Sequence, residues 1–395
     1  MRVVTLTFPG RFEDAFLYMG RLVAITENHS VRSYDMENIV NKFQENESLH
    51  DAPQLLFLRN DLIDHENFRL RHNKTNKKET FLKAIENFKQ KIVPIDLSFI
   101  KYMEWDLNID ADFLLDLNIY NKRLYIGANT GLYSIDLDWD KEDLEPINGH
   151  KPKKRLDAKC INTTIKFGTV NASCGSDGWF SFLDDFSLVE SNISKEKHID
   201  EYSLRTSWLD YSIVNYSTTI NLTLIKTVRT STEQELIDIQ NEFDQEIVTD
   251  LQAESTSHLD DLFRDSKVNL DYQNLQFLYN SSRCLFANTY DGQFITLSLQ
   301  KSGDSTPKIT YAKPYEGLES FIFSIHTINI GNGAGLILET DEKILLFANG
   351  KFISIFEGEV ISIRTFSRSK YHKNIVSITT SDQIFLIAIF DDEAY

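Results

Sequence analysis

One short pattern recurs along the 395 residues of the chain: an apolar strand, a small polar turn, and a second strand in which apolar residues alternate with polar ones. It occurs seven times, with turns centred near residues 27, 129, 176, 218, 291, 341 and 382. Most intervals between successive turns are about 40 to 50 residues, the length of one four-stranded propeller blade. The sequence therefore predicts a fold built from seven successive antiparallel sheets.

The two ends of the chain are predicted to share one sheet. The last copy of the pattern has three strands, near residues 361–365, 375–379 and 384–390, where a blade needs four. An apolar strand at residues 2–8 is left over, and pairing it with the last strand would cover both open sheet edges. We therefore predict an all-β fold: a seven-bladed β-propeller, a single domain over residues 1–395, whose N-terminal strand closes the last blade.

The chain resembles WD40-like β-propellers. Repeats of that family carry Gly-His before the innermost strand and Trp-Asp at the end of the third strand. Gly149-His150 matches the first mark, about 30 residues before residues 182–184. Tyr34-Asp35 and Ile135-Asp136 stand where Trp-Asp would be, and the other copies lack both marks. The resemblance implies that the turns between second and third strands lie around the mouth of a central channel.

Residues 37–97 form the first of two long insertions. A possible outer strand at residues 55–58 is followed by a predicted helix at residues 79–91, with apolar residues at helical spacing. Bases outnumber acids around this helix, and Lys77, Lys78 and Lys83 are among them. The segment is either a solvated loop and surface helix or a docking site for an acidic partner or a phosphate backbone.

Residues 230–266 form the second insertion. It opens at residues 232–235 with a capping-box pattern and continues as an apolar stripe at helical spacing. Acids dominate it, with Arg264 as the one base. We expect an acidic helix, either packed on the rim of the propeller or offered to a partner protein.

A separate basic run lies at residues 151–155 and includes Lys153, Lys154 and Arg155. Such a run is typical of an ordinary surface loop, and it also resembles an anion-binding patch or a nuclear-import signal. Together with the basic helix, it forms the basis of a hypothesis that the chain is a nucleic-acid-associated subunit. The net charge of −18 argues against wrapping duplex nucleic acid.

Acidic residues recur in the predicted turns. An Asp in a turn bonds its own backbone and stabilises the hairpin, so a structural role is the simplest interpretation. The same acids could instead ring the channel mouth and serve a hydrolase or lyase. Two aromatic residues flank them, and a mixture of aromatic and acidic side chains also suits a protein-binding face. The candidate residues of this face are Glu27, Asp177, Trp179, Tyr290, Asp291, Asp341 and Asp382.

Motifs for other chemistry are absent from the sequence. There is no phosphate-binding loop, no His-Glu-x-x-His, no Cys-x-x-Cys and no Gly-x-Ser-x-Gly, and we expect no cofactor and no metal. The three cysteines have no paired spacing, and neither a signal peptide nor a run of apolar residues long enough to span a membrane occurs. We expect a cytoplasmic protein, or a nuclear one in a eukaryote, that acts as a non-enzymatic protein–protein interaction scaffold.

Overall fold

The computed structural model describes the chain in stretches. These are residues 1–45, 52–63, 79, 81–83, 85–86, 93–95, 97, 100–139, 145–147, 151–166, 168–184, 196–199, 202–209, 212–217, 222–226, 256–257, 274–281, 284–300, 308–315, 318, 321–331 and 333–391. The chain divides into two compact units, one made of Met1–Asn108, Asp138–Glu145 and Ser320–Tyr395, the other of Ile109–Leu137 and Pro146–Glu319. We refer to them as the first and the second unit. Whether the chain is a single domain stays a prediction.

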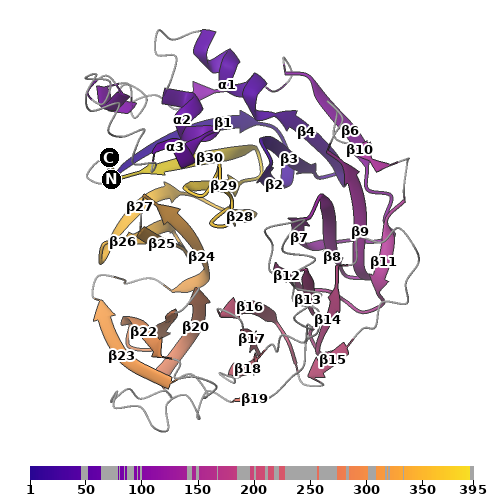
Figure 1. Ribbon diagram of the computed structural model, residues 1–395, viewed down its shortest axis with the longest axis vertical. Helices are drawn as coiled ribbons and strands as arrows, with labels where there is room; N and C mark the ends of the chain where they lie inside the picture. Colours follow the sequence, from indigo (N-terminus) through magenta and orange to yellow (C-terminus); the bar gives the residue numbers. More distant parts are fainter. Residues whose placement is uncertain are drawn as a thin grey trace, which may run out of the picture. The chain divides into compact units, whose positions relative to one another are not determined.

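The described residues form seven sheets, and within each sheet the strands follow one another mostly in chain order (Figure 1). Three sheets belong to the first unit. They are β2 (Phe12–Tyr18), β3 (Arg21–Thr26), β4 (Ser30–Asp35) and β6 (Tyr102–Asp106); β24 (Ile322–Ile330), β25 (Gly333–Thr340), β26 (Lys343–Ala348) and β27 (Lys351–Glu357); and β28 (Ser362–Thr365), β29 (Ile375–Thr379), β30 (Gln383–Phe390), β1 (Arg2–Pro9) and β5 (Val93–Pro94).

The strands of the other four sheets lie in the second unit, apart from Asp138 and Glu145, which belong to the first. They are β7 (Leu114–Tyr120), β8 (Arg123–Ala128) and β9 (Gly131–Asp138) with the short strands β10 (Glu145–Pro146) and β11 (Lys153–Leu156); β12 (Asn162–Lys166), β13 (Thr169–Ser173), β14 (Trp179–Leu183) and β15 (Glu196–Ile199); β16 (Arg205–Leu209), β17 (Ser212–Tyr216), β18 (Leu222–Lys226) and β19 (Thr256–Ser257); and β20 (Leu275–Ser281), β21 (Cys284–Thr289), β22 (Phe294–Gln300) and β23 (Lys308–Tyr315). Each turn that the sequence pattern located lies between the second and third strands of one sheet.

The two ends of the chain pair as predicted. Strand β1 runs antiparallel to β30, from Arg2 opposite Phe390 to Pro9 opposite Gln383, and the two strands lie side by side in Figure 1. On its other edge β1 pairs in parallel with β5, which comes from the first insertion. We call the sheet β28–β29–β30–β1–β5 the terminal sheet. The N-terminal strand β1 is an interior strand of this sheet and not an edge strand.

Neighbouring sheets meet through their first strands. In the second unit, Oδ2 of Asp116 on β7 accepts hydrogen bonds from the backbone N–H of Thr163 on β12, at 2.6 Å, and from its hydroxyl, at 2.8 Å. The side-chain amide of Asn280 on β20 donates to the carbonyl of Trp208 on β16 at 2.8 Å. These polar contacts are needed because backbone and side-chain groups buried between sheets lose their contact with water.

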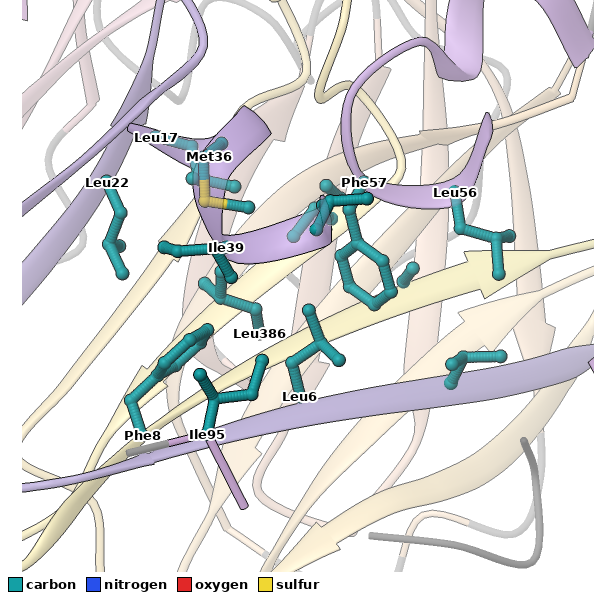
Figure 2. Close-up of a cluster of buried hydrophobic side chains, with 14 of the residues drawn as sticks. Leu6, Phe8, Leu17, Leu22, Met36, Ile39, Leu56, Phe57, Ile95 and Leu386 are labelled. Carbon is teal, nitrogen blue, oxygen red and sulfur yellow. The ribbon is translucent and has the colours of Figure 1, made fainter. Parts of the chain in front are cut away.

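The first insertion begins as a helix and packs on the terminal sheet. Helix α1 (Met36–Glu45) is capped by Asp35, whose Oδ1 accepts the N–H of Glu37 at 2.8 Å. Met36, Ile39 and Val40 are buried, at the spacing of one helix face. Figure 2 shows Met36 and Ile39 packed above Leu6 and Leu386 of the terminal sheet.

The strand predicted at residues 55–58 is wrong, because this segment forms helix α2 (Ala52–Phe57), followed by α3 (Asn60–Ile63). Leu55, Leu56 and Phe57 are all buried. A short run of apolar residues that is buried on every side gives no periodicity, so the sequence cannot separate a strand from a buried helix.

Part of the predicted basic helix falls within the described residues. Residues 79, 81–83, 85 and 86 are helical, and Phe81 and Ile85 are buried. The ring of Phe81 meets that of Phe390 edge-on at 5.6 Å. Of the acidic insertion at 230–266, only residues 256 and 257 are described, as strand β19 paired with β18, and the predicted helix lies outside the described residues. Among the described residues, no helix is long and apolar enough to span a lipid bilayer.

Candidate functional site

Each sheet has one end at which its first strand begins. Because neighbouring strands are antiparallel, the turn between the second and third strands lies at the same end. The backbone joins the two features directly: the N–H of Tyr290, in a turn, donates to the carbonyl of Asn274, just before β20, and the N–H of Asn129 donates to the carbonyl of Phe113, just before β7. We call the end of a sheet at which its first strand begins the bulged end.

The first strands of four sheets carry a β-bulge in the same place, one residue after the strand begins. A bulge inserts one unpaired residue and re-aims its side chain. The four inserted residues are Glu13 on β2, Leu115 on β7, Gln276 on β20 and Phe323 on β24. Phe323 is 55% exposed, although an apolar residue near the start of a strand would ordinarily face the core.

Exposed apolar side chains gather at the bulged end. In the described part of the chain, seven large ones lie at the start of a first strand or in the adjoining turn, and two, Met19 and Tyr102, lie elsewhere. The seven are Phe321, Phe323 and Ile361 in the first unit, and Phe113, Leu115, Tyr202 and Tyr290 in the second. Single exposed apolar residues are ordinary, but their concentration at one end of successive sheets is not.

The acids that the sequence placed in turns are all exposed at the bulged end: Glu27, Asp177, Asp291, Asp341 and Asp382. Two of them receive a hydrogen bond from a threonine of their own turn, Asp291 from Thr289 and Asp382 from Thr380. The bond from Thr289 holds the pKa of Asp291 below its ordinary value. These two carboxylates are therefore bonded within their own turns, through a threonine side chain.

Threonines, rather than aspartates, close most of these hairpins. Thr26, Thr289, Thr340 and Thr380 each follow or end a second strand. Each hydroxyl lies within hydrogen-bond distance, across the turn, of the carbonyl of the residue that begins the third strand or, for Thr289, of the residue just before it, at 3.3, 3.2, 2.8 and 3.1 Å. In the first three, the hydroxyl also accepts the N–H of that same residue. This feature was not predicted, although the sequence has a threonine at the end of the second strand in four copies of the repeat.

The two aromatic candidates have different surroundings. Tyr290 is 68% exposed and belongs to the bulged end. Trp179 is completely buried, and its indole N–H donates to Oδ1 of Asn171 at 3.2 Å. A surface role for Trp179 is incompatible with this burial, and its ring is part of the core. Trp179 begins the third strand β14 directly after the turn, and the sequence alone does not reveal to which face of the strand it points.

The basic candidates do not form one surface. Lys77 and Lys78 lie outside the described residues, and Lys83, in the first unit, lies 2.7 Å from Oε1 of Glu79. In the second unit, Lys153 is exposed on β11, and the ammonium of Lys154 contacts the carboxylate of Asp157.

Arg155, the last base of this run, points inward. Its Nε donates to the hydroxyl of Ser134 at 2.6 Å, and burial lowers the pKa of its guanidinium. Residues 153–155 of the basic run therefore belong to strand β11, which pairs with β9, and are not a free loop.

The second unit contains a buried ionic cluster that was not predicted from the sequence. Arg123 contacts the carboxylates of Asp136 and Asp184, and the hydroxyl of Tyr125 donates to Asp184. Burial raises the pKa of the Tyr125 hydroxyl. Asp136 stands where the WD40 resemblance places the Asp of Trp-Asp, and it binds the same guanidinium as Asp184. The cluster joins β8, β9 and the end of β14, at the opposite end of these sheets from the bulged end.

The described residues offer little for catalysis. No group of three or more His, Cys, Asp or Glu among them could hold a metal ion. Burial raises the pKa of Glu13, whose Oε1 lies 3.6 Å from Nε2 of His29. This pair, near the carboxylates of Asp14 and Glu27, is the nearest approach to an acid–base site at the bulged end.

No model of a known protein family matches the chain, and no curated protein sequence matches it. Solved structures do match. The β-propeller domain of Cps50 (Swd1) from Myceliophteria thermophila is similar with a TM-score of 0.50 at 9% identity, over 97% of this chain and 99% of that one.

Two further propellers are similar at the same level. The WD40 β-propeller domain of Doa1 gives a TM-score of 0.48 at 10% identity, over 98% and 97% of the two chains, and the N-terminal domain of Nup159 gives 0.49 at 6% identity, over 99% and 96%. At such identities a likeness shows the fold alone. The chain has a WD40-like β-propeller fold.

Proposed function

We propose that the chain is a seven-bladed propeller that acts as a non-enzymatic protein–protein interaction scaffold, and that partners bind at the bulged ends of neighbouring sheets within a unit. The fold itself does not decide this, because propellers carry out unrelated functions. The observation that carries the proposal is the concentration of exposed apolar side chains at the bulged end. Such residues are energetically unfavourable in water, and contiguous apolar surface on a soluble fold is typical of an interaction site.

Two further features support this assignment. Bulges recur next to binding and active sites because they re-aim side chains without breaking the sheet, and here four first strands carry one at the same place. Hydrogen bonds from the threonines hold the hairpins of this end in fixed geometry. A rigid face loses little conformational entropy when a partner binds.

The alternative functions have weaker support. A hydrolase or lyase that uses the turn acids needs a turn carboxyl group with a raised pKa, whereas the pKa of Asp291 is lowered. The pKa of Glu13 is raised, but Glu13 lies at a bulge and not in a turn. A nucleic-acid interface needs bases that are free to meet phosphate. Lys83 and Lys154 are each already paired with an acid, and Arg155 faces inward.

Affinity capture with a matched control tests the proposal. The full-length chain and the variant Phe321→Ser/Phe323→Ser are immobilised and exposed to extract of the native source, and bound proteins are identified by mass spectrometry. The control is Met19→Ser, which removes an apolar side chain that is 57% exposed in the turn between β2 and β3, at the opposite end of its sheet. We expect specific proteins that the wild type and the control retain and the double variant loses. Equal recovery by all three chains contradicts the assignment of the binding face.

A further inference from the structure

Three exposed apolar side chains of the first unit lie on two adjacent sheets. Phe321 and Phe323, at the start of β24, have ring centroids 5.3 Å apart and are 46% and 55% exposed. Ile361, 53% exposed, directly precedes β28, and β24 and β28 are contacting first strands. We call these three residues the Phe–Ile patch. Phe323 is the residue inserted by the bulge in β24, and a bulge re-aims the side chain of the residue that it inserts.

The described residues around the Phe–Ile patch are strongly acidic. The pairing of Ile322 with Thr340 places the turn after β25 beside the two phenylalanines, and the N–H of Ile361 donates to the carbonyl of Thr379, which places the turn after β29 beside Ile361. At this end of the two sheets, the described residues include five exposed acids, Asp341, Glu342, Glu357, Glu359 and Asp382, and two bases. The bases are the half-buried Lys343 and Arg11, which follows the residue bonded to the carbonyl of Asp382 and whose guanidinium lies 3.7 Å from the carboxylate of Glu27.

This charge pattern restricts the partner. An acidic segment would meet like charges on both sides of the patch, and juxtaposed like charges oppose binding. A segment that carries lysine or arginine would be attracted to the same surface. Its cations could also lie over the faces of Phe321 and Phe323, an arrangement that stabilises a complex in its own right. Apolar side chains between those bases would cover the patch itself.

We propose that the Phe–Ile patch binds a basic segment of a partner protein in which lysine or arginine side chains flank apolar ones. The proposal rests on the proposed function and adds the chemistry of the partner. The apolar side chains bury the patch, and the bases meet the acids of the two adjoining turns and of the residues that lead into β28. Binding of this kind weakens as salt screens the exposed charges.

Two fluorescent peptides of equal length serve as probes, one with alternating lysine and leucine and the other with alternating glutamate and leucine. Binding to the full-length chain is followed by fluorescence polarisation at low and at high salt. Two variants separate the contributions: Phe321→Ser/Phe323→Ser removes the rings, and Asp341→Asn/Glu342→Gln/Asp382→Asn removes charge while an amide at residue 382 can still accept the Thr380 hydroxyl. The control is Glu37→Gln, which neutralises an exposed acid on α1.

We expect the lysine peptide to bind, the glutamate peptide not to bind, and each multiple variant to weaken binding of the lysine peptide roughly tenfold, the size of effect expected for loss of a hot-spot contact. High salt should weaken it as well, and the control should not. If the glutamate peptide binds as tightly and depends on the phenylalanines, the patch is an interaction site and the partner chemistry is wrong. If neither peptide responds to loss of the phenylalanines, the patch is not the site, and the proposed binding face fails with it.

Discussion

Arg364 holds the carboxylate of Asp14 across two sheets. Its Nη2 donates to Oδ2 of Asp14 at 2.6 Å, and its Nε lies 3.2 and 3.1 Å from the two carboxylate oxygens. The hydroxyl of Ser362 donates to the same carboxylate at 2.8 Å, and the guanidinium lies over the ring of Phe16 at 4.7 Å. Asp14 is on β2, directly after the bulge, and Arg364 is on β28. The pair therefore joins the first strand of the sheet β2–β3–β4–β6 to the first strand of the terminal sheet.

Loss of one partner of this pair should destabilise the fold. The Asp14 side chain is 5% exposed, so Asp14→Ala leaves a partly buried guanidinium without its carboxylate. We expect a loss of about 3 kcal/mol in the free energy of unfolding, measured by urea denaturation. The control is Arg11→Ala, which breaks an exposed pair with Glu27 at 3.7 Å and should cost less than about 1 kcal/mol. Equal losses in the two variants would show that the bridge between the sheets contributes nothing.

Deletion of residues 1–9 should abolish cooperative folding of the terminal sheet. Strand β1 lies between β30 and β5, and its buried side chains Val4, Leu6 and Phe8 belong to the core that also holds helices α1 and α2. Without β1, both neighbouring strands have open edges and the helices lose the surface on which they pack. We expect the thermal transition of the truncated chain, followed by circular dichroism, to broaden and to move well below that of the full chain.

A point variant gives a milder test of the same strand. Leu6→Ala removes a side chain that is 1% exposed and should cost about 2–5 kcal/mol, whereas Thr5→Ala, at a half-buried position of the same strand, should cost much less. A melting curve of the truncated chain that matches the full chain would show that β1 is dispensable. Restoration of the transition by an added synthetic peptide of residues 1–9 would show that pairing, rather than chain length, is responsible.

The repeat, the turns and the pairing of the chain ends were predictable because they rest on local pattern. Alternation of apolar residues marks a half-buried strand wherever it occurs, and Gly, Asn and Asp mark the tight turns between strands. The predicted turn near residue 291 is an example, since Gly292 adopts a positive φ, 82°, that few other residues tolerate. The leftover strand at residues 2–8 was assigned by counting strands, and β1 pairs with β30 as that count required.

The candidate site was less predictable, because it depends on register and burial. A bulge is an extra residue relative to the partner strand, so the outward turn of Phe323 cannot be recognised until its pairing with β25 is known. Trp179 was predicted to be exposed because it lies beside a turn, but its side chain is buried. Helix α2 was misread because its consecutive buried residues have no period. In each case the sequence shows which residues are present but not which of them meet water.

The threonines that close the hairpins should each contribute to stability independently. Thr340→Val keeps the shape of the side chain but removes the hydroxyl that donates to the carbonyl of Lys343 at 2.8 Å and accepts its N–H at 3.2 Å. We expect a loss of about 1 kcal/mol in the free energy of unfolding. The same substitution at Thr26, whose hydroxyl has the equivalent partners in another sheet, should add to it within error, because the two turns share no contact partners.

The neighbouring acids should matter less than these threonines. Asp341→Asn, beside Thr340, leaves the threonine bonds in place and should change stability by no more than about 0.5 kcal/mol. Both variants are measured by urea denaturation beside the wild type. If Asp341→Asn costs as much as Thr340→Val, the aspartate and not the threonine holds the hairpin.

His372 should make the fold sensitive to mild acid. The imidazole is completely buried, its Nδ1–H donates to the carbonyl of Phe57 at 3.1 Å, and burial lowers its pKa from 6.5 to about 4. As the pH falls, His372 is therefore protonated near pH 6.5 in the unfolded chain but only near pH 4 in the folded chain. The contribution to stability is complete above the unfolded pKa and declines as the pH falls from 6.5 toward 4, by at most about 3 kcal/mol.

The variant His372→Asn isolates this effect, because the asparagine amide can still donate to the carbonyl of Phe57 and has no proton to gain. Unfolding by urea is measured for both chains near neutral pH and at about pH 5, where the wild type should have lost stability through His372. We expect a smaller decline for the variant than for the wild type, even if the variant is less stable at neutral pH. Equal declines would place the acid sensitivity elsewhere. Because His372 bonds the last residue of α2 from the segment between β28 and β29, a confirmed decline would also show that the first insertion is held to the terminal sheet by a neutral imidazole.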